Sequence, residues 1–363
     1  MSTPPETRQP ASSPRITFAA GGWVILLAVV LTLGICVWRF STVLGGRGSK
    51  AVGDGENVAT YGFDLSTCLI PRDRIVAAGM PKDGLPALVN PPTMPARQVD
   101  ILNDEMRGKF LVSSDRVVGL HLDGVSRAYP VRMLNWHEVV NDTIGNVPVA
   151  VTYNPLCDSA VAFNRRVGGE TLTFGVSGLL YNSNLLMYDR RPDPADESLW
   201  SQLQCRAVAG PSAAAGDSLT VLHTSLVRWA DWQVLHPETE VLAPDPALMD
   251  RYKREPYGSY YGSDQLRFPV DPLPPADGLP RKTPVVVVGA GGRQRVFSLA
   301  TIATNADTSG TWRTVVGNVP VRFTVRSDPL TAWVEPEDPG HSVQTVYCFW
   351  FAWYATHPGA TLE

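Results

Sequence analysis

Basic charge is scarce in this sequence: 31 Lys and Arg stand against 35 Asp and Glu, for a net charge of −4 over 363 residues. An acidic surface repels a phosphate backbone, so the composition argues against nucleic acid as a partner. Long apolar runs are scarce too. Only residues 16–38 form an apolar run that is long enough to cross a bilayer. The run Tyr347–Tyr354 is also apolar but far too short. A second membrane-spanning helix is therefore not expected.

Complete catalytic motifs are also lacking. Val288–Gly292 resembles a dinucleotide-binding loop, but Gln294 stands where the last glycine is required. Gly175–Gly178 is one residue too short for the turn that carries a nucleophilic serine. His137 begins a zinc-protease pattern, but Asn141 takes the place of its second histidine. The sequence thus offers no conventional nucleotide, serine-hydrolase or two-histidine zinc site.

Residues 16–38 are predicted to form one transmembrane helix, bracketed by Arg15 and Arg39. A cleaved signal peptide is the alternative, but no small-residue cleavage site follows closely. Ile35 before Cys36 also breaks a lipoprotein-type site. Basic residues lie on both sides of the helix, so charge orients it only weakly. We expect a signal-anchor in the cell membrane, with the large domain outside the cytoplasm, in the periplasm or extracellular space.

The helix divides the N-terminal region. Residues 1–15 form a tail, and residues 39–58, rich in Gly and small polar residues, form a linker. In residues 59–108 the spacing of Pro and Gly leaves little regular structure, so we expect an extended arm that wraps the body. A disordered linker is the alternative interpretation.

The rest of the chain carries one pattern twice. Gly145–Val149 recurs as Gly317–Val321, and Trp229–Pro237 recurs as Trp350–Pro358. The two motifs lie farther apart in the first copy, which indicates an insertion of about 50 residues. In chain order we expect a first repeat at 109–244 with the insertion at about 164–215, a connecting segment at 245–283, and a second repeat at 284–363.

Turn signals predict antiparallel strands in both copies. Asp123-Gly124 and Gly291-Gly292 each lie between β-type runs, the pattern of a hairpin. Pro130 to Asp142 is predicted to be a short helix, and Trp229 to Leu235 another that closes the unit. With 31 Pro and 31 Gly, turns and short strands should dominate. We expect a mainly β fold with short helices (α+β): two related antiparallel β units from an internal duplication, packed about a pseudo-twofold axis.

A polar set occurs in the first copy only. Cys157 aligns with Pro329, and His137 has no counterpart, so the shared fold requires neither. A thiol at a pocket mouth beside an imidazole could act as a nucleophile. Alternatively, the two could ligate a soft metal ion, or Cys157 could simply be buried while His137 caps a turn. Further candidates for binding or support near this pair are Glu138, Asn141, Asp142 and Asn154.

The insertion adds a second group of polar residues. They could line a binding site, or they could stabilise turns and strand edges. Asp189 with Arg190 or Arg191 could support the thiol site or form an ion pair at the root of an exposed loop, Pro192 to Asp196. The group consists of Asn182, Asn184, Asp189, Arg190, Ser198 and Gln202.

Cysteine pairing is open at this point. Four cysteines lie outside the predicted membrane helix, and no close spacing selects one of their three pairings. A disulfide at Cys157 would remove the thiol hypothesis. The four are Cys68, Cys157, Cys205 and Cys348.

Several blocks of this sequence resemble the family of proteins of unknown function DUF3179, over roughly residues 65 to 363. The blocks include Gly79–Leu88, Val151–Cys157, Asn184–Arg190 and Ser198–Gln202. The resemblance implies a bacterial or archaeal protein, commonly secreted or membrane-attached, without an established reaction. It also implies that members often carry a second cysteine where Asn154 stands, which weakens a dithiol or two-cysteine metal site in this chain.

Two functions remain open. The first is a binding or assembly module at the membrane surface, held by residues 16–38 and associated with other subunits of a membrane complex. The second is an extracytoplasmic thiol- or metal-dependent enzyme or redox protein centred on Cys157 and His137. A separation of these two below about 5 Å beside an open pocket would favour the second. The sequence indicates no particular cofactor or metal.

Overall fold

Strands make up most of the regular structure in this computed structural model, which describes residues 51–105, 109–276 and 279–363. Residues 52–363 form one compact unit. The predicted membrane helix at 16–38 lies outside the described residues. Within the described ranges, no helix is long and apolar enough to span a membrane.

The first half of the body is a series of short strands closed by a helix. The hairpin predicted at Asp123-Gly124 forms, with positive φ at both residues. Its elements in chain order are β4 (Arg116–Leu122), β5 (Val125–Pro130), α3 (Val131–Leu134), β6 (Val139–Ile144), β7 (Val147–Asn154), β8 (Ser159–Asn164), β16 (Ser225–Arg228) and α5 (Trp229–Leu235).

The second half repeats this order of elements. Its hairpin turns at Gly291-Gly292, again with positive φ at both residues. The elements are β18 (Pro284–Ala290), β19 (Arg293–Ser298), α8 (Leu299–Asn305), β20 (Thr311–Val316), β21 (Val319–Ser327), β22 (Leu330–Pro336), β23 (Gln344–Phe349) and α9 (Trp350–Thr356).

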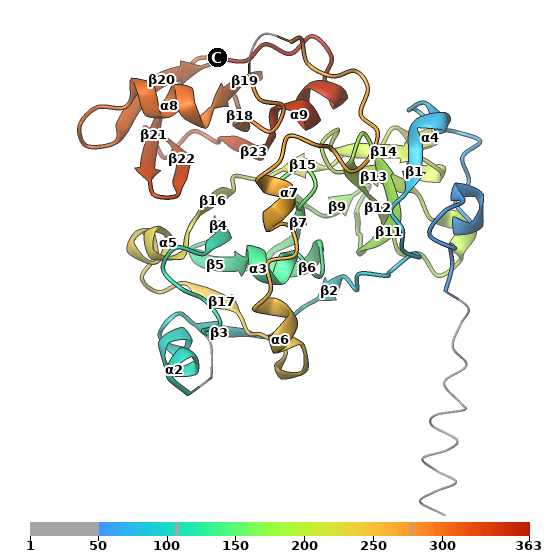
Figure 1. Cartoon of the computed structure of the whole chain (residues 1–363), viewed down its shortest axis with the longest axis horizontal. Coiled ribbons are helices and arrows are strands. Elements are labelled where there is room, and N and C mark those ends of the chain that lie inside the picture. The colour runs from blue at the N-terminus through green and yellow to red at the C-terminus, as the bar shows by residue number, and fades with distance from the viewer. Residues whose placement is uncertain (1–50, 106–108, 277–278) are drawn as a thin grey trace, which may run out of the picture. The chain divides into compact units, whose positions relative to one another are not determined.

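The pairing of strands is also the same in both halves. The last strand pairs with the first and the first with the second, which gives β16-β4-β5 and β23-β18-β19. The three middle strands form antiparallel meanders, β6-β7-β8 and β20-β21-β22. Strand β23 pairs with β8 through Tyr347 and Ala160, so the two halves share one sheet. Figure 1 labels β18 and β23 of the second half and β6 and β7 of the first half, which belong to this sheet. The order of strands in this shared sheet is β19-β18-β23-β8-β7-β6-β2, and β15 (Thr220–Val221) pairs with β8.

The insertion forms most of a further sheet, ordered β1-β11-β12-β13-β14. Its neighbours in the chain are the two-residue strands β9 (Arg166–Val167) and β10 (Glu170–Thr171), which pair with each other. The sheet's inserted elements are β11 (Phe174–Tyr181), β12 (Asn184–Asp189), η4 (Pro194–Asp196), β13 (Leu199–Ser201), β14 (Arg206–Ala209) and α4 (Pro211–Ala215).

The described part of the N-terminal arm, residues 59–105, adds a strand to each of three sheets. β1 (Ile75–Ala77) pairs with β11, β2 (Leu88–Val89) with β6, and β3 (Thr93–Pro95) with β17 (Glu240–Leu242). The arm also contains η2 (Val58–Tyr61), η3 (Arg72–Arg74) and α2 (Arg97–Glu105). Through these pairings the arm contacts three sheets of the body.

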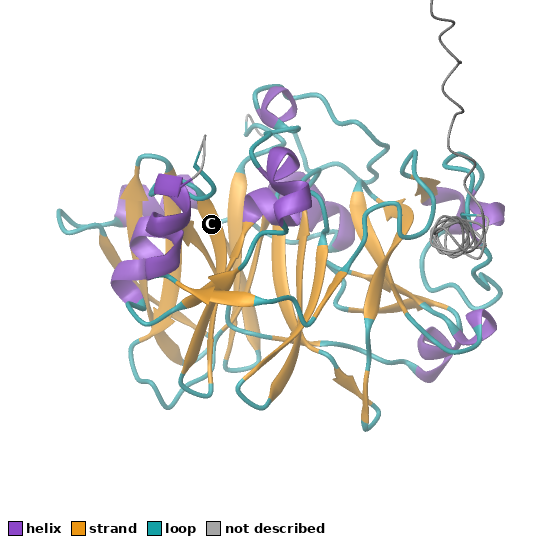
Figure 2. Ribbon diagram, turned by 90° about the horizontal axis from the view of Figure 1, so that it is seen from below, coloured by secondary structure: helices purple, strands orange, loops and turns teal. Residues whose placement is uncertain are grey.

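The end of the predicted linker already belongs to the body. The carbonyl of Val52 accepts a hydrogen bond from Lys82 N, and that of Gly55 accepts one from Gly79 N. Farther along, the connecting segment crosses the first half with η5 (Pro246–Leu248), α6 (Met249–Tyr252) and α7 (Gly258–Tyr261). Figure 2 shows the strands standing side by side across the molecule, with the helices gathered along its margins.

The helix predicted from Pro130 to Asp142 was wrong for most of its length. α3 ends at Leu134, and β6 begins at Val139. β-Branched residues favour a strand, and Val139 and Val140 pair with Thr152 and Val151 of β7. This non-local pairing overrides the local helix signal, and it places Asn141 and Asp142 on a strand.

One hydrophobic cluster joins the two halves. It contains Val118 and Val151 from the first half and Val286, Phe297 and Phe323 from the second, all buried. Burial of this apolar surface drives the association of the halves. A second cluster packs the inserted sheet against β7 and β8. The inserted sheet thus covers one side of the first half. The second half has no insertion to cover its equivalent side.

Candidate functional site

Four side chains, of the predicted residues Gln202 and Asn184 and their neighbours Ser159 and Thr152, form a closed hydrogen-bond network inside the first half. Gln202 Oε1 accepts from Ser159 Oγ at 2.6 Å and from Asn184 Nδ2 at 2.8 Å. Gln202 Nε2 donates to Thr152 Oγ1 at 2.9 Å. All four side chains are buried. Buried polar groups need such partners, and here they supply them to one another.

Cys157 lies in the turn between β7 and β8, inside the protein and not at a pocket mouth. Its thiol is fully buried and donates to Ser183 O at 3.3 Å, while its amide donates to Asn154 Oδ1 at 3.2 Å. Burial raises the pKa of the Cys157 thiol, and the smaller opposing effect of Asn184 does not offset this. The group is therefore a thiol at neutral pH, which is the unreactive form.

The four described cysteines are all free. None of the three pairings that the sequence left open is formed, and Cys157 keeps its thiol. Cys348 on β23 is also buried, and burial raises its pKa. The two cysteines belong to neighbouring segments, because Phe349 N donates to Cys157 O at 2.7 Å.

His137 is held by partners other than Cys157. Its Nδ1 lies 2.7 Å from Pro86 O, which can only accept, so Nδ1 carries the proton. Its Nε2 accepts from the Tyr252 hydroxyl at 2.8 Å. Burial lowers the pKa of His137, so the ring is neutral. Within the described residues, no hydrogen bond joins His137 to Cys157.

Glu138 is the exception in this interior. Its carboxyl is buried and has no hydrogen bond or ion pair among the described residues, and burial raises its pKa to about 8. Cys157 lies within range of its charge. Next to it, the side-chain nitrogen of Asn154 is buried without a partner among the described residues. The sequence pointed to both residues but gave no sign that they would be unpaired.

The backbone at Glu138 has a counterpart in the second half that explains why this position is unusual. Glu138 has φ +54° just before β6, and Gly310 has φ +77° just before β20. Their carbonyls accept equivalent bonds, from Tyr153 N and Val325 N, both at 2.8 Å. The framework thus requires a left-handed residue here, and glycine meets this requirement without strain. The first half instead carries a carboxyl side chain, a feature typical of functional positions.

Two further predicted residues lie on β6 and form hydrogen bonds with neighbouring strands. Asn141 donates to Phe174 O at 2.8 Å and accepts from Phe174 N at 2.7 Å, which fixes β11 against β6. Asp142 accepts from Arg127 and from the Tyr129 hydroxyl, both at 2.7 Å. Both side chains are buried and satisfied by these bonds.

The remaining predicted residues of the insertion form hydrogen bonds and ion pairs that stabilise its loops. Asp189 accepts from Ser198 N at 2.6 Å and pairs with Arg191 at 2.7 Å. Arg190 instead pairs with Asp83 of the N-terminal arm at 2.9 Å.

Asn182 joins three segments of the chain. It donates to Ala355 O at 3.1 Å and accepts from Asp271 N at 3.0 Å. Its contacts, like those of Asp189 and Arg190, fit the interpretation that these residues stabilise turns and strand edges.

Sequence reasoning missed a cleft of about 660 Å³ between the two halves. Strand β4, the β15–β16 segment and α5 supply one wall, and β22 with residues 337–344 supplies the other. Four of the chain's six histidines line it, although they are far apart in sequence. They are His121, His223, His236 and His341.

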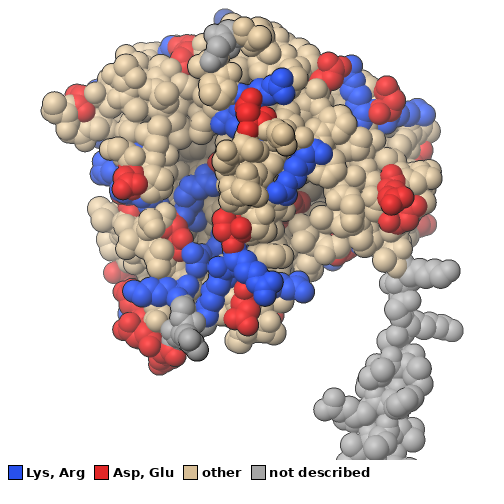
Figure 3. All heavy atoms as spheres, viewed as in Figure 1, with Lys and Arg blue, Asp and Glu red and all other residues tan. Residues whose placement is uncertain are grey.

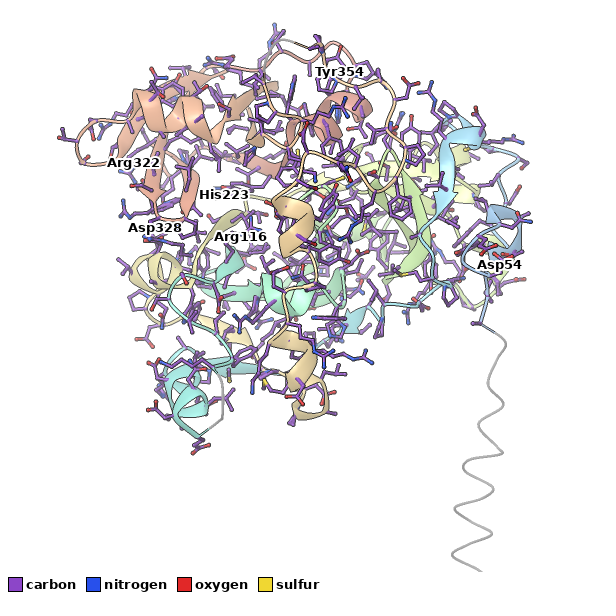
Figure 4. All side chains as sticks on the ribbon, in the orientation of Figure 1. Asp54, Arg116, His223, Arg322, Asp328 and Tyr354 are labelled. Atoms are coloured by element: carbon purple, nitrogen blue, oxygen red, sulfur yellow. The ribbon has the colours of Figure 1, made fainter. Side chains whose placement is uncertain are left out.

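The cleft carries mixed charge. Glu335 and Glu337 line its second-half wall, and Arg322 pairs with Glu335 at 2.7 Å. Burial lowers the pKa of His236, and His121 lowers it further by charge repulsion. In the side-chain view, His223 lies between the ribbon of the second half and that of the first (Figure 4).

A smaller cavity of about 60 Å³ opens beside Arg116 and is lined by Cys348 and Leu330. Arg116 binds both carboxylate oxygens of Asp158 at 2.8 Å, and the Tyr153 hydroxyl donates to the same carboxylate at 2.6 Å. In Figure 4 Arg116 is labelled near Asp328, and Pro329, which follows Asp328, lines a pocket together with Arg116.

Basic side chains gather on the surface below this point, near α3 and α6 (Figure 3). A pocket of about 260 Å³ there is lined by Arg132, Lys253 and Arg254. Asp115 and Glu255 line the same pocket, and Asp115 pairs with Arg132 at 2.7 Å. The acidic residues thus balance part of this positive charge.

Comparison with known families identifies the chain. The family described as "Protein of unknown function (DUF3179)" matches residues 82–360, so the chain belongs to it. This confirms the resemblance noted in the sequence. No curated protein and no solved structure matches the chain. Within the described residues, no group of three or more His, Cys, Asp or Glu side chains is arranged to hold a metal ion.

Proposed function

We propose that this DUF3179 protein is a membrane-anchored, extracytoplasmic module that binds a ligand or partner in the cleft between its two halves. One observation carries the proposal. Apart from Glu138 and Asn154, the polar side chains predicted from the sequence are bonded to their surroundings, whereas the histidine-lined cleft is open. Concave sites with a few polar groups on an apolar lining are the usual ligand sites.

Two parts of the proposal concern the chain's organisation. The shared order and pairing of elements support an origin of the two halves by internal duplication. The apolar run at residues 16–38 supports a single anchor in the cell membrane, with the body on the extracytoplasmic side. Other subunits of a membrane complex are the partners that such a display suits.

The location can be tested with an added surface thiol. Val234 is 81% exposed, so Val234→Cys, made in a chain that also carries Cys68→Ser, provides a label site in the body. In intact cells a membrane-impermeant maleimide should modify this variant without lysis. Labelling that requires lysis would place the body in the cytoplasm and contradict the proposed localisation.

Binding can be tested by a thermal-shift screen of small molecules and peptides on the full-length chain in the presence of EDTA. A ligand that binds the native state raises the unfolding temperature. Ser342→Trp should abolish the shift, because Ser342 is an exposed part of the cleft lining. Ser259→Trp adds the same bulk at an exposed position on α7, outside the cleft, and should retain the shift.

Glu138 supports a second candidate function, an enzyme that uses acid–base chemistry beside Cys157. A carboxyl with a pKa of about 8 can give or take a proton near neutral pH. A hit in the same screen that survives Ser342→Trp and is lost in Glu138→Gln would favour this function over cleft binding. The residues do not indicate a cofactor for it, and both ring nitrogens of His137 already have partners.

A further inference from the structure

A second pocket adjoins the cleft between the halves. Its volume is about 330 Å³, and Thr220, Val221 and Gln344 line both hollows. Residues 203–205 and 218–219 supply one side of the pocket, and β18, β19, β23 and the end of α9 supply the other. Within the described residues, no charged side chain lines this pocket, whereas the cleft beside it is lined by residues of both charges. An ionic ligand would therefore find no counter-charge in the pocket.

Two glutamines of the pocket lie on either side of a glycine. Gly289 on β18 is paired with Gln294 of β19 and with Gln344 of β23. Residues directly opposite each other on neighbouring strands direct their side chains to the same face of the sheet. A Cβ atom at Gly289 would lie 3.2 Å from Gln344 Oε1 and 3.6 Å from Gln294 Cγ. The missing side chain thus leaves space between two amide side chains.

The first half fills the equivalent position. Counted from the repeated hairpin turns, Gly289 corresponds to His121, and counted from the repeated tryptophan motif, Gln344 corresponds to His223. The framework therefore accepts a large side chain at the central position. The φ angle of Gly289 is not positive, so its backbone conformation does not require glycine. A glycine inside a strand often marks a place where a ligand approaches the backbone closely.

The pocket also contains acceptors that need a donor. Gln204 lines it, and the Oε1 atom of this side chain is buried without a partner among the described residues. His357 Nδ1 lies 3.1 Å from Thr356 Oγ1, which donates its own proton to a main-chain carbonyl of α9, so Nδ1 carries the ring proton. Burial lowers the pKa of His357, so the ring is neutral and its Nε2 is an acceptor. A carboxylate or phosphate, which only accepts, would leave both acceptors unpaired.

An uncharged ligand rich in hydroxyl groups suits both the amides and these acceptors. A hydroxyl donates and accepts at once, and a side-chain amide also offers both, so neighbouring hydroxyls match Gln294 and Gln344. Val221, Val287 and Val346 supply apolar surface for the C–H face of a sugar ring. We infer that this pocket binds one uncharged sugar unit of a glycan that continues into the cleft past Gln344. The inference rests on the proposed function, because it names the ligand class of the cleft.

The direct test is calorimetric titration of the full-length chain with maltotriose, mannotriose, galactotriose and triacetylchitotriose. At least one of these neutral trisaccharides should bind at a single site per chain. Trigalacturonic acid, which carries a carboxylate on every unit, should bind at least about tenfold more weakly than that sugar, because the pocket offers no compensating charge. This comparison uses wild type alone and does not depend on the folding of any variant.

Variants of the glycine and the two glutamines locate the site. Gln294→Ala and Gln344→Ala should each weaken binding of the sugar by about 3- to 10-fold, because each removes hydrogen bonds to its hydroxyls. Gly289→Val fills the space between the amides and should abolish binding. Gln98→Ala is the matched control, because Gln98 is an exposed residue of α2 outside the pocket and the cleft. This variant should bind the sugar like wild type.

Three results would overturn the inference. They are the absence of binding of all four neutral trisaccharides by wild type, tighter binding of trigalacturonic acid than of every neutral sugar, and equal affinity in wild type, Gln294→Ala and Gly289→Val. Failure of the inference is distinguishable from failure of the proposed function, because Ser342 lines the cleft but not the pocket. Absence of sugar binding, together with a hit of the thermal-shift screen that is lost in Ser342→Trp, would remove the inference and leave cleft binding intact.

Discussion

The two halves of this protein use one framework in different surroundings. In the first half, β7 is buried at every position after Val147, whereas the equivalent β21 alternates between buried and more exposed residues. The inserted sheet packs against the first meander and covers the face that the second half leaves accessible. Polar residues on that face can therefore persist only as hydrogen-bonded pairs or as functional exceptions. The network around Gln202 is of the first kind, whereas the unpaired Glu138 is of the second.

Glu138 should produce the largest effect. Its folded-state pKa of about 8 lies above the ordinary value of 4.5, so the folded chain retains a proton that the unfolded chain has lost. Wild-type stability should therefore fall as the pH rises from 4.5 to about 8 and then level off. At about 1.4 kcal/mol per unit, the total fall from this group is on the order of 3–5 kcal/mol.

Glu138→Gln should lose this part of the pH dependence, measured by urea unfolding of the full-length chain at a series of pH values. Glu138→Gly copies the residue found at Gly310 and should also relieve the left-handed strain, with a gain of roughly 1 kcal/mol. Identical pH profiles for wild type and both variants would mean that the carboxyl is solvated or paired.

Gln202→Ala should have the next largest effect. It removes the partner of Ser159, Asn184 and Thr152 in a buried network, so the free energy of unfolding should fall by about 2–4 kcal/mol. Gln294→Ala changes an exposed glutamine of β19 and should stay within about 0.5 kcal/mol of wild type. Similar losses in both variants would show that the first-half interior is open to water.

The closest comparison between halves uses equivalent threonines. Thr152 is fully buried and donates to Val161 O at 2.8 Å, whereas Thr324 at the same place in β21 is partly exposed. Thr152→Val should lower the free energy of unfolding by about 1–2 kcal/mol. For Thr324→Val a change within about 0.5 kcal/mol is expected. Urea titrations of the two variants side by side measure the difference that the insertion makes.

The smallest effect is expected at the edge of the insertion. Arg190 and Asp83 form an ion pair in which both side chains are more than one third exposed. Solvent screens such pairs, so Arg190→Ala should lower the free energy of unfolding by less than about 1 kcal/mol. Added salt should reduce this difference further. A loss several times larger would mean that Arg190 has a role beyond this contact.

Local signals predicted the elements that depend on local chemistry. Asp123-Gly124 and Gly291-Gly292 form the expected hairpin turns, and Trp229–Leu235 forms the expected helix. The helix assigned to Pro130–Asp142 failed because the pairing of Val139 with Thr152 comes from a distant strand. Propensity within one segment cannot report such a partner.

The site was less accessible to sequence reasoning than the fold. Residue types marked Glu138 and Cys157 as unusual, but burial and the missing partner of the carboxyl depend on how the insertion folds over them. The cleft lies still farther from local information, because His121 and His236 face His341 only when the two halves pack together. His236 also lies in the motif Trp229–Pro237 that recurs in the second copy, where His357 takes its place. Its stacking on Trp232 is indeed shared, whereas its contact with Ser126 belongs to the first half alone.

The most direct test of the closed first-half interior is alkylation of the native full-length chain, with each cysteine quantified by mass spectrometry. Cys68 is partly exposed and should be modified, whereas the buried Cys157 should react only after unfolding. This result would agree with a buried thiol whose pKa is raised, and with ligand binding at the cleft. Modification of native Cys157 as fast as that of Cys68 would contradict the account and return the thiol to the centre of the function.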